Sequence, residues 1–300
     1  MSCEDFNYTK AYSRNIGLLT EEEQEKIKNS RVAIAGMGGV GGSHFISFVR
    51  HGFQKFNIAD YDRFDLVNFN RQYGANTRTV GRKKTEVMKE HAKAINPECD
   101  IKEFNEKVSK KNLEEFLEGA SLAIDGIDCW EVDARRDFLN TAYNLNVPVI
   151  SAGPVGFSTA YIIFMQGKGN MSPDQYFAWR DDQPYDEKLG LFFLGVFPSA
   201  LQIKYMGIDK ERLRKTFVEK SGPSSIGAIN LCSGVTVING VRILLKKEKV
   251  KAAPYYHQFD AMADRYKLGR LRWGNSGPVQ QLKKWYMLKV VRDCKTEKEA

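Results

Sequence analysis

This 300-residue sequence has few of the residues from which zinc sites and histidine-based catalytic sites are built. Its five cysteines are scattered and form no Cys-x-x-Cys pair, so we expect no structural zinc. Their odd number and lack of pairing favour a reducing compartment. The four histidines offer no clear catalytic acid or base: His44, His51, His91 and His257.

Targeting and membrane signals are also missing. The first five residues are acidic and polar, which does not resemble a signal peptide. The most apolar long stretch, residues 226–245, contains Asn230, Asn239 and Arg242, so a buried helix fits it better than a membrane span. We therefore expect a cytoplasmic protein without a membrane partner.

The overall composition is that of a globular protein, with 42% hydrophobic and 27% charged residues. The net charge is +8, and much of the excess lies late, at residues 246–247, 270–272 and 283–284. This excess fits either a solvated, lysine-rich surface or an anionic partner such as nucleic acid. Because no nucleic-acid motif accompanies it, we favour the solvated surface.

The most informative feature is residues 32–42, an apolar, β-prone stretch that leads into a glycine-rich turn. Gly36, Gly38 and Gly41 follow the spacing Gly-x-Gly-x-x-Gly. They permit, in turn, a tight turn, close approach of the backbone to a phosphate, and close packing of helix on strand. The helix N-terminus then suits an anion. We expect a nucleotide near residues 36–42, Gly39 included, although the motif alone does not identify it.

Up to about residue 151, strand and helix patterns alternate in the rhythm of a doubly wound parallel sheet. We expect strands near 31–36, 55–60, 100–104, 121–125 and 148–151, and helices near 20–29, 40–51, 81–95, 109–118 and 131–145. The predicted fold class is α/β with a mostly parallel, Rossmann-like sheet.

The pattern changes after residue 153. We expect a β-prone run at 155–165, an irregular lid or crossover at 167–188, helices at 199–218 and 224–247, a hairpin at 254–272 and a helix at 278–292. These predictions divide the chain into an N-terminal helical arm (1–29), a nucleotide-binding core (30–165), and an extension (166–300) that completes the same domain.

Asp60 ends the second predicted strand, nineteen residues after Gly41, where an acidic residue typically accepts hydrogen bonds from ribose. It suits NAD or ATP equally. Further polar and charged residues accompany it: Arg14, Asp62, Asn68, Arg71, Gln72, Lys84 and Asp128. A dinucleotide has one pyrophosphate, which a helix terminus largely accommodates, whereas a triphosphate needs more cations. The set therefore favours ATP.

With these residues the sequence resembles the ThiF/MoeB/HesA family, relatives of ubiquitin-activating enzymes. The resemblance covers about residues 10–165 and extends to Arg135-Arg136 and Leu139-Asn140, whereas the remainder matches loosely. It implies a ThiF-type fold and an ATP- and Mg²⁺-dependent adenylyltransferase. The substrate is often the C-terminal carboxylate of a small ubiquitin-like or sulfur-carrier protein, and the products are an acyl-adenylate and pyrophosphate.

The resemblance also implies roles for single residues. Asp60 would bind ribose, Asn68, Arg71 and Lys84 would hold phosphates, and Asp128 would hold Mg²⁺. Asp62 and Gln72 belong to the same nucleotide-binding stretch. Arg14 resembles the arginine that reaches across a homodimer into the partner's site, although Asn15 stands where the family usually has glutamine.

Simpler structural roles remain open for these residues. Arg71 and Arg14 fit exposed surface arginines, Lys83 could act in place of Lys84, and Asp128 could cap the following helix. Residues 153–220 contain no cysteine, so we expect no thioester step on that segment. Cys232 fits a core residue, and Cys129 adjoins the proposed metal site.

Three alternatives stand beside carboxylate adenylation of a protein: a tRNA-modifying dehydratase of the same superfamily, which adenylates a carboxylate on tRNA; an NAD-dependent oxidoreductase; and an inactive nucleotide-binding scaffold.

Overall fold

The computed structural model describes residues 6–206 and 222–296. It begins with two short helices, α1 (Tyr8–Ala11) and η2 (Ser13–Asn15), followed by α2 (Glu21–Asn29). Thr20 caps α2, and its hydroxyl and the Glu23 carboxylate accept each other's backbone N–H, which confirms the predicted helix start. Tyr8 and Tyr12 fasten this arm to the C-terminal end of α3 through the carbonyls of Gly52 and Val49.

Five parallel strands form one half of the sheet, in the order β3-β2-β1-β4-β5. The elements are β1 (Arg31–Ala35), α3 (Gly39–Arg50), β2 (Lys55–Ala59), η3 (Leu66–Asn68), α4 (Lys84–Ile95), β3 (Asp100–Phe104), α5 (Leu113–Leu117), β4 (Leu122–Asp125), α6 (Val132–Asn144) and β5 (Val149–Val155). The predicted α/β class and strand alternation are confirmed.

Two helices begin later than predicted. Helix α4 starts at Lys84 rather than near 81, because Lys83 forms a β-bridge with Arg63 and Gly81 adopts a positive φ. Helix α5 starts at Leu113 rather than near 109, because the Asn112 side chain accepts the Ser109 N–H and holds a turn there.

Three antiparallel strands continue the same sheet after β5: β6 (Ser158–Phe164), β7 (Tyr255–Asp260) and β8 (Arg265–Arg270), so the predicted hairpin is confirmed. The helical elements of this half are α7 (Pro173–Phe177), α8 (Tyr185–Val196), η4 (Ala200–Gln202), α9 (Ile203–Met206), α11 (Ile226–Leu245), η5 (Gly274–Ser276) and α12 (Pro278–Thr296). The domain boundaries at residues 29 and 165 stay predictions.

The second half also departs from the predictions. Segment 167–188 is not irregular: it contains α7 and the start of α8, and α7 has a capping box between Ser172 and Gln175 with Pro173 at its first position. The helix predicted at 199–218 is divided into η4 and α9 up to residue 206, and the rest of that prediction lies outside the described residues. Helix α12 is longer than predicted and reaches Thr296.

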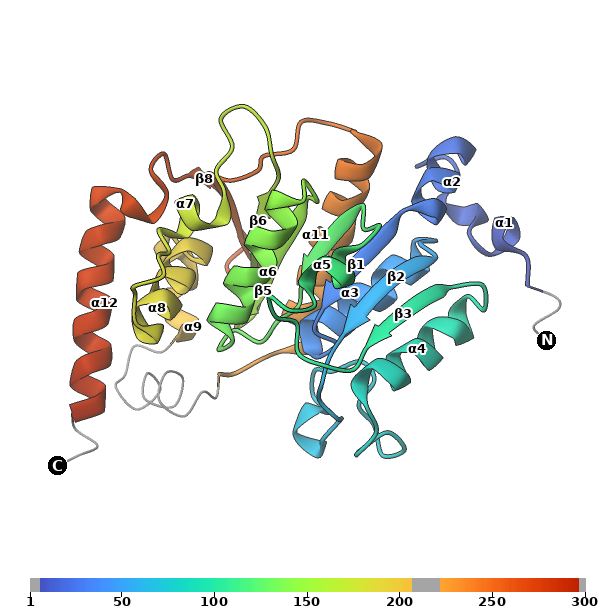
Figure 1. Ribbon diagram of the computed structural model, residues 1–300, viewed down its shortest axis with the longest axis horizontal. Helices are drawn as coiled ribbons and strands as arrows, with labels where there is room; N and C mark the ends of the chain where they lie inside the picture. Colours follow the sequence, from blue (N-terminus) through green and yellow to red (C-terminus); the bar gives the residue numbers. More distant parts are fainter. Residues whose placement is uncertain (1–5, 207–221, 297–300) are drawn as a thin grey trace.

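Helices cover the sheet on both faces (Figure 1). On one face α3, α4 and α11 pack around a core that includes Phe45, Met88 and Cys232. On the other, α5, α6, α7 and α8 pack around Phe116, Phe138 and other side chains. Because the parallel strands are covered on both faces, their carboxyl ends supply the exposed edge at which α/β proteins bind ligands.

Helix α11 is long and apolar enough to cross a membrane by composition, but half of that window is buried within the fold. It packs against α3, β5 and β6, and the Ser233 hydroxyl lies 3.0 Å from Nδ1 of the buried His44 on α3. This packing is that of a core helix. The absence of a membrane partner stays a prediction.

Candidate active site

A cavity of about 740 Å³ lies at the carboxyl ends of β1, β2 and β4. Strands β1 and β4 are neighbours, so the strand order reverses there, which is where doubly wound sheets bind ligands. The structure brings most of the predicted site residues to its wall: Gly36, Gly38, Gly39, Asp60, Asp62, Arg71, Gln72, Lys84 and Asp128. Arg14, Gly41 and Asn68 are not among its lining residues.

A side chain at each of the three motif glycines would meet a different obstacle. Gly36 has a φ of +95°, and a Cβ there would lie 2.2 Å from the carbonyl oxygen of Gly126. A Cβ at Gly41 would lie 1.8 Å from the carbonyl oxygen of Gly36. At Gly38 the nearest described atom would be 3.7 Å away, on Gln72, so nothing in the described part of the chain requires glycine at this position. The space beside Gly38 belongs to the cavity, where a Cβ would meet a ligand.

Asp60 is held in place by the backbone. Its Oδ2 accepts the Met37 N–H at 2.7 Å, and its Oδ1 accepts the Asp62 N–H at 2.8 Å. Each carboxylate oxygen keeps further acceptor capacity, which ribose hydroxyls could use. Helix α3 begins beside it at Gly39 without a side-chain cap, so its first N–H groups and the positive end of its dipole suit an anion.

Four basic side chains line the same cavity, Arg71, Lys84, Lys107 and Arg135, and the first two are predicted site residues. Lys84 is only 6% exposed and pairs with Asp62 at 2.9 Å, whereas Lys83 is exposed and does not line the cavity. Arg71 donates to the Val67 carbonyl at 2.7 Å and to the Asn70 side chain at 2.9 Å, so its guanidinium is partly turned onto its own loop. The geometry thus favours Lys84 over Lys83 as the residue for an anionic ligand.

Asn68 and Gln72 occupy different environments. The Asn68 side chain is buried and accepts the Asp65 N–H at 3.0 Å, which closes the capping box of η3. In this conformation the Asn68 side chain is not directed to the cavity lining, and its contact with phosphate stays a prediction. Gln72 lines the cavity beside Gly38, and its buried Oε1 has no hydrogen-bond partner among the described residues.

Asp128 lies on a loop that a buried arginine organises. Arg135 of α6 donates to Asp125 Oδ2 at 2.8 Å and to the carbonyls of Ile127, Asp128 and Cys129. Asp125 also accepts the Ser151 hydroxyl at 2.6 Å. Sequence reasoning missed this network. The signal it offered was that Asp125 ends a strand ten residues before Arg135, but partners across two strands and a helix cannot be inferred from spacing.

Asp128 is exposed toward the cavity, and its Oδ1 accepts the Trp130 N–H at 3.0 Å. It therefore caps this turn and not α6, whose N-cap is Glu131. The described residues hold no group of three or more metal-ligating side chains. A lone hard carboxylate still fits Mg²⁺, which keeps several waters and is completed by substrate phosphates. Mg²⁺ binding and the absence of zinc stay predictions.

Three described cysteines, Cys99, Cys129 and Cys232, have raised pKa values. Burial raises the pKa of the Cys129 thiol to about 12, and it does the same for Cys232 within α11. Cys232 is fully buried, which confirms it as a core residue. Cys129 lines the cavity beside Asp128 but stays protonated at neutral pH, so it is a poor nucleophile.

Arg14 lies far from the cavity of its own chain. It is exposed in η2, which packs at the C-terminal end of α3, whereas the cavity adjoins the N-terminal end. Twelve helical residues separate the two ends, a length of about 18 Å. An action of Arg14 at this site therefore requires a second copy of the chain.

Part of the cavity wall is aromatic, and sequence reasoning missed it. Phe193 and Phe197, in α8 and just after it, line the cavity together with Tyr205 of α9. Tyr205 is held by a hydrogen bond to the buried Asp260 at 2.9 Å. The sequence predicts irregular chain at 167–188, and no motif in that segment indicates that the crossover and α8 pack beside the cavity.

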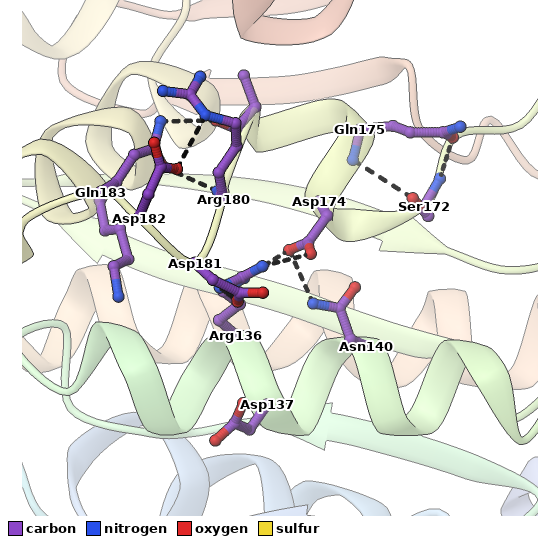
Figure 2. A network of polar contacts seen from close by, with 12 residues as sticks. Arg136, Asp137, Asn140, Ser172, Asp174, Gln175, Arg180, Asp181, Asp182 and Gln183 are labelled. Carbon is purple, nitrogen blue, oxygen red and sulfur yellow. Dashed lines mark hydrogen bonds and ion pairs between the residues drawn. The ribbon is translucent and has the colours of Figure 1, made fainter.

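A polar network fastens this crossover to α6. Arg136 contacts both oxygens of Asp174 at 2.8 Å and Asp181 at 2.7 Å, and Asn140 donates to Asp174 (Figure 2). The hydrogen bond from Arg136, together with its positive charge, lowers the pKa of Asp181. Adjacent arginines on one helix thus have separate tasks, because Arg135 holds the Asp128 loop and Arg136 holds the crossover.

The doubly wound sheet, the glycine turn and the anchored Asp60 define a nucleotide-binding α/β protein. Comparison with known proteins narrows this class, because the model of the ThiF family matches residues 12–276. The chain belongs to the ThiF family.

Alignments with individual relatives cover less of this chain than the family model does. A tRNA threonylcarbamoyladenosine dehydratase from Bacillus subtilis is 33% identical over 144 residues, 47% of this chain and 55% of that protein. The sulfur carrier protein ThiS adenylyltransferase of Escherichia coli is 30% identical over 149 residues, 49% of this chain and 58% of that protein. The matches thus span little more than half the length of these relatives.

Solved structures support the fold. The crystal structure of E. coli MccB with ATP has a TM-score of 0.66 at 17% identity and covers 90% of this chain and 73% of that one. The predicted Rossmann-like, ThiF-type architecture is confirmed. The NAD-dependent oxidoreductase alternative is wrong, because the relatives of this family are adenylyltransferases and dehydratases that modify tRNA.

Proposed function

We propose that this chain is an ATP-dependent adenylyltransferase that activates a carboxylate with the help of Mg²⁺. The observation that carries the proposal is the convergence of an uncapped helix N-terminus, Arg71, Lys84 and Asp128 on one cavity, with Asp60 at its ribose end. Similarity to the E. coli adenylyltransferase, and to MccB in its crystal structure with ATP, supports the choice of nucleotide.

The chemistry requires positive charge more than a general base. A carboxylate is already ionised, and its oxygen attacks the α-phosphorus while the bond to the leaving pyrophosphate breaks, which yields an acyl-adenylate. The obstacle is repulsion, since two unit charges 4 Å apart repel by about 4 kcal/mol at an effective dielectric constant near 20. Preorganised cations are the usual remedy in phosphoryl chemistry.

The residues divide this task. The α3 N-terminus and Gly38 receive phosphate oxygens, Gln72 adds a side-chain amide beside them, and Arg71 and Lys84 supply positive charge. A triphosphate would compete with Asp62 for Lys84 and would draw the Arg71 guanidinium from its loop contacts. Asp128 would hold Mg²⁺, which neutralises charge on the phosphate oxygens. Arg135 keeps the Asp128 loop in place.

Two carboxylate substrates remain candidates. The first is the C-terminus of a small ubiquitin-like or sulfur-carrier protein, and the E. coli relative is named for the sulfur carrier protein ThiS. The second is a carboxylate on tRNA, and the B. subtilis relative is named a tRNA threonylcarbamoyladenosine dehydratase. The basic side chains of the C-terminal extension, at residues 265–292, favour the second candidate. No thioester step is proposed, because residues 153–220 lack cysteine and the Cys129 thiol has a raised pKa.

We further propose a cytoplasmic homodimer in which Arg14 acts across the interface. Apolar side chains are exposed beside Arg14, at Ile16 and Leu18, and beside the cavity, at Leu66 and Val67. Burial of these two patches against each other would bring Arg14 of one copy toward the cavity of the other.

Pyrophosphate exchange into ATP tests the activity. Wild-type protein is expected to exchange labelled pyrophosphate when a suitable carboxylate is supplied, and Asp128→Ala is expected to lose at least about 100-fold of the rate. Asp133→Ala removes an exposed carboxylate five residues away and serves as the matched control. Unchanged pyrophosphate exchange in Asp128→Ala would contradict the role assigned to Asp128. If calorimetry showed binding of NAD but not of ATP, the proposed adenylation would be wrong.

A further inference from the structure

The excess of positive over negative charge in this protein lies in its C-terminal segment, residues 246–300. Residues 246–300 contain fourteen basic and six acidic side chains, which accounts for the whole net charge of +8. Residues 265–292, which form β8, η5 and most of α12, contain eight lysines and arginines and no acidic residue. Such a one-signed segment creates a field that attracts a polyanion.

The structure places part of this charge on one face. Lys267 of β8 is opposite Gln258 of β7, and residues directly opposite in an antiparallel pair share a face. The Gln258 side chain accepts the N–H and hydroxyl of Ser199, so this face is the one on which the crossover lies. Arg265, two residues from Lys267, shares it.

Helix α12 adds a further ammonium group to the same face. Lys283 donates to the carbonyl of Pro198 at 2.6 Å, next to Ser199. Burial lowers the pKa of Lys283, and the positive charge of Lys267 lowers it further, so the two ammonium groups lie close enough to repel. Neither takes part in an ion pair among the described residues. A bound anion would relieve this repulsion.

The basic face adjoins the cavity. Pro198 follows Phe197, which lines the aromatic wall of the cavity. Arg265 is opposite Asp260, whose carboxylate holds Tyr205 of the same wall. A chain of phosphates on Arg265, Lys267 and Lys283 would therefore lead to the aromatic wall of the cavity.

Exposed aromatic rings accompany the charge. Tyr286 is 65% exposed and lies one helical turn from Lys283 on α12, and Trp273 and Trp285 are similarly exposed. Aromatic side chains beside cations are typical of surfaces on which unpaired bases stack. A purely electrostatic surface for folded acidic proteins does not need them.

We propose that the face formed by Arg265, Lys267, Lys283 and Tyr286 binds RNA through its phosphates and an unpaired base. This surface presents a bound RNA to the cavity. RNA binding itself is independent of the proposed adenylation, whereas the delivery of RNA to the cavity rests on that proposed function. It favours the RNA-borne carboxylate over the protein C-terminus as substrate.

Fluorescence anisotropy with a labelled RNA stem-loop, without nucleotide, tests the proposal. We expect a dissociation constant of about 1–100 µM at physiological salt. Lys267→Ala/Lys283→Ala is expected to weaken binding about tenfold and to lower the salt slope by about two. Tyr286→Ala is expected to weaken it about fivefold. Because Lys283 also holds the Pro198 carbonyl, Lys267→Ala alone is included, with a salt slope lowered by about one.

Lys10→Ala/Lys26→Ala is the matched control. It removes the same charge from the exposed arm, which lies at the opposite side of the molecule from α12 (Figure 1). Equal weakening by control and test variants would overturn the proposal, as would binding to phosphatidylserine vesicles in place of RNA. Loss of RNA binding in the test variants together with absent pyrophosphate exchange would leave this inference standing and contradict the proposed function alone.

Discussion

The nucleotide-binding half and the C-terminal extension use positive charge in opposite ways. In the first, Lys84 is buried on the cavity wall, paired with Asp62 and fixed at the start of α4. In the second, Lys267 is exposed on an edge strand and faces another lysine. The difference teaches that single buried cations indicate a small ligand with defined geometry, whereas exposed cations in series indicate a large and flexible one.

The largest expected effect separates glycines that the fold requires from the glycine that a ligand requires. Gly41→Ala would place a Cβ 1.8 Å from a backbone oxygen, so we expect it to destabilise the protein by at least about 3 kcal/mol. Gly38→Ala has 3.7 Å of space, so we expect native stability and weakened ATP binding. Thermal unfolding and calorimetry measure the two quantities. Normal ATP affinity in Gly38→Ala would show that phosphate does not approach this turn.

The next effect concerns a neighbouring pair of lysines. Lys84→Ala is expected to reduce pyrophosphate exchange about 100-fold or more, since it removes a fixed charge from the reacting phosphates. Its ion pair with the half-exposed Asp62 contributes at most about 1 kcal/mol, so thermal stability should change little. Lys83→Ala, at an exposed position, is the control and should stay within about twofold of wild type. The reverse pattern would assign the role to Lys83.

The third effect is a pH dependence of stability, and it lies where the two halves meet. His44 of α3 contacts Ser233 of α11, and burial lowers its pKa from 6.5 to about 3. A lowered pKa means that the folded state resists protonation, so stability is full above pH 6.5 and falls as the pH drops toward 3. The slope contributed is up to about 1.4 kcal/mol per pH unit. Urea unfolding of His44→Gln between pH 7 and 4 should show a shallower decline than wild type.

The His91→Gln variant provides the control for this experiment. It removes a histidine from α4 that contacts Tyr73 and lies away from the boundary between the halves. Its decline should match that of wild type. If His44→Gln declines as steeply as wild type, the coupling of the halves does not involve this histidine.

The two halves also differ in how far the sequence predicts them. The parallel strands are short, β-prone runs between turn signals, and their sequence alone places β1 to β4 within about one residue. Strand β5 instead extends to Val155, beyond the predicted end at residue 151. The glycine spacing likewise predicts Gly36, Gly38 and Asp60 at one site. Both patterns are local, so they can be read without knowledge of distant contacts.

Features formed by distant segments could not be predicted in this way. The Arg135–Asp125–Ser151 network joins a helix to two strands, and the aromatic wall needs the crossover to pack against the sheet. Arg14 lies outside the cavity of its own chain, and its predicted action across a homodimer stays a prediction. The start of α7, in contrast, could have been predicted locally, because Ser172 and Gln175 have the spacing of a capping box.

A structure of the protein with Mg²⁺ and a non-hydrolysable ATP analogue tests the central claim most directly. The account predicts the triphosphate at the N-terminus of α3, in contact with Gly38, Arg71 and Lys84, and the ribose hydroxyls on Asp60. A nucleotide bound elsewhere, or one bound in the cavity with both cations directed away from its phosphates, would contradict the account.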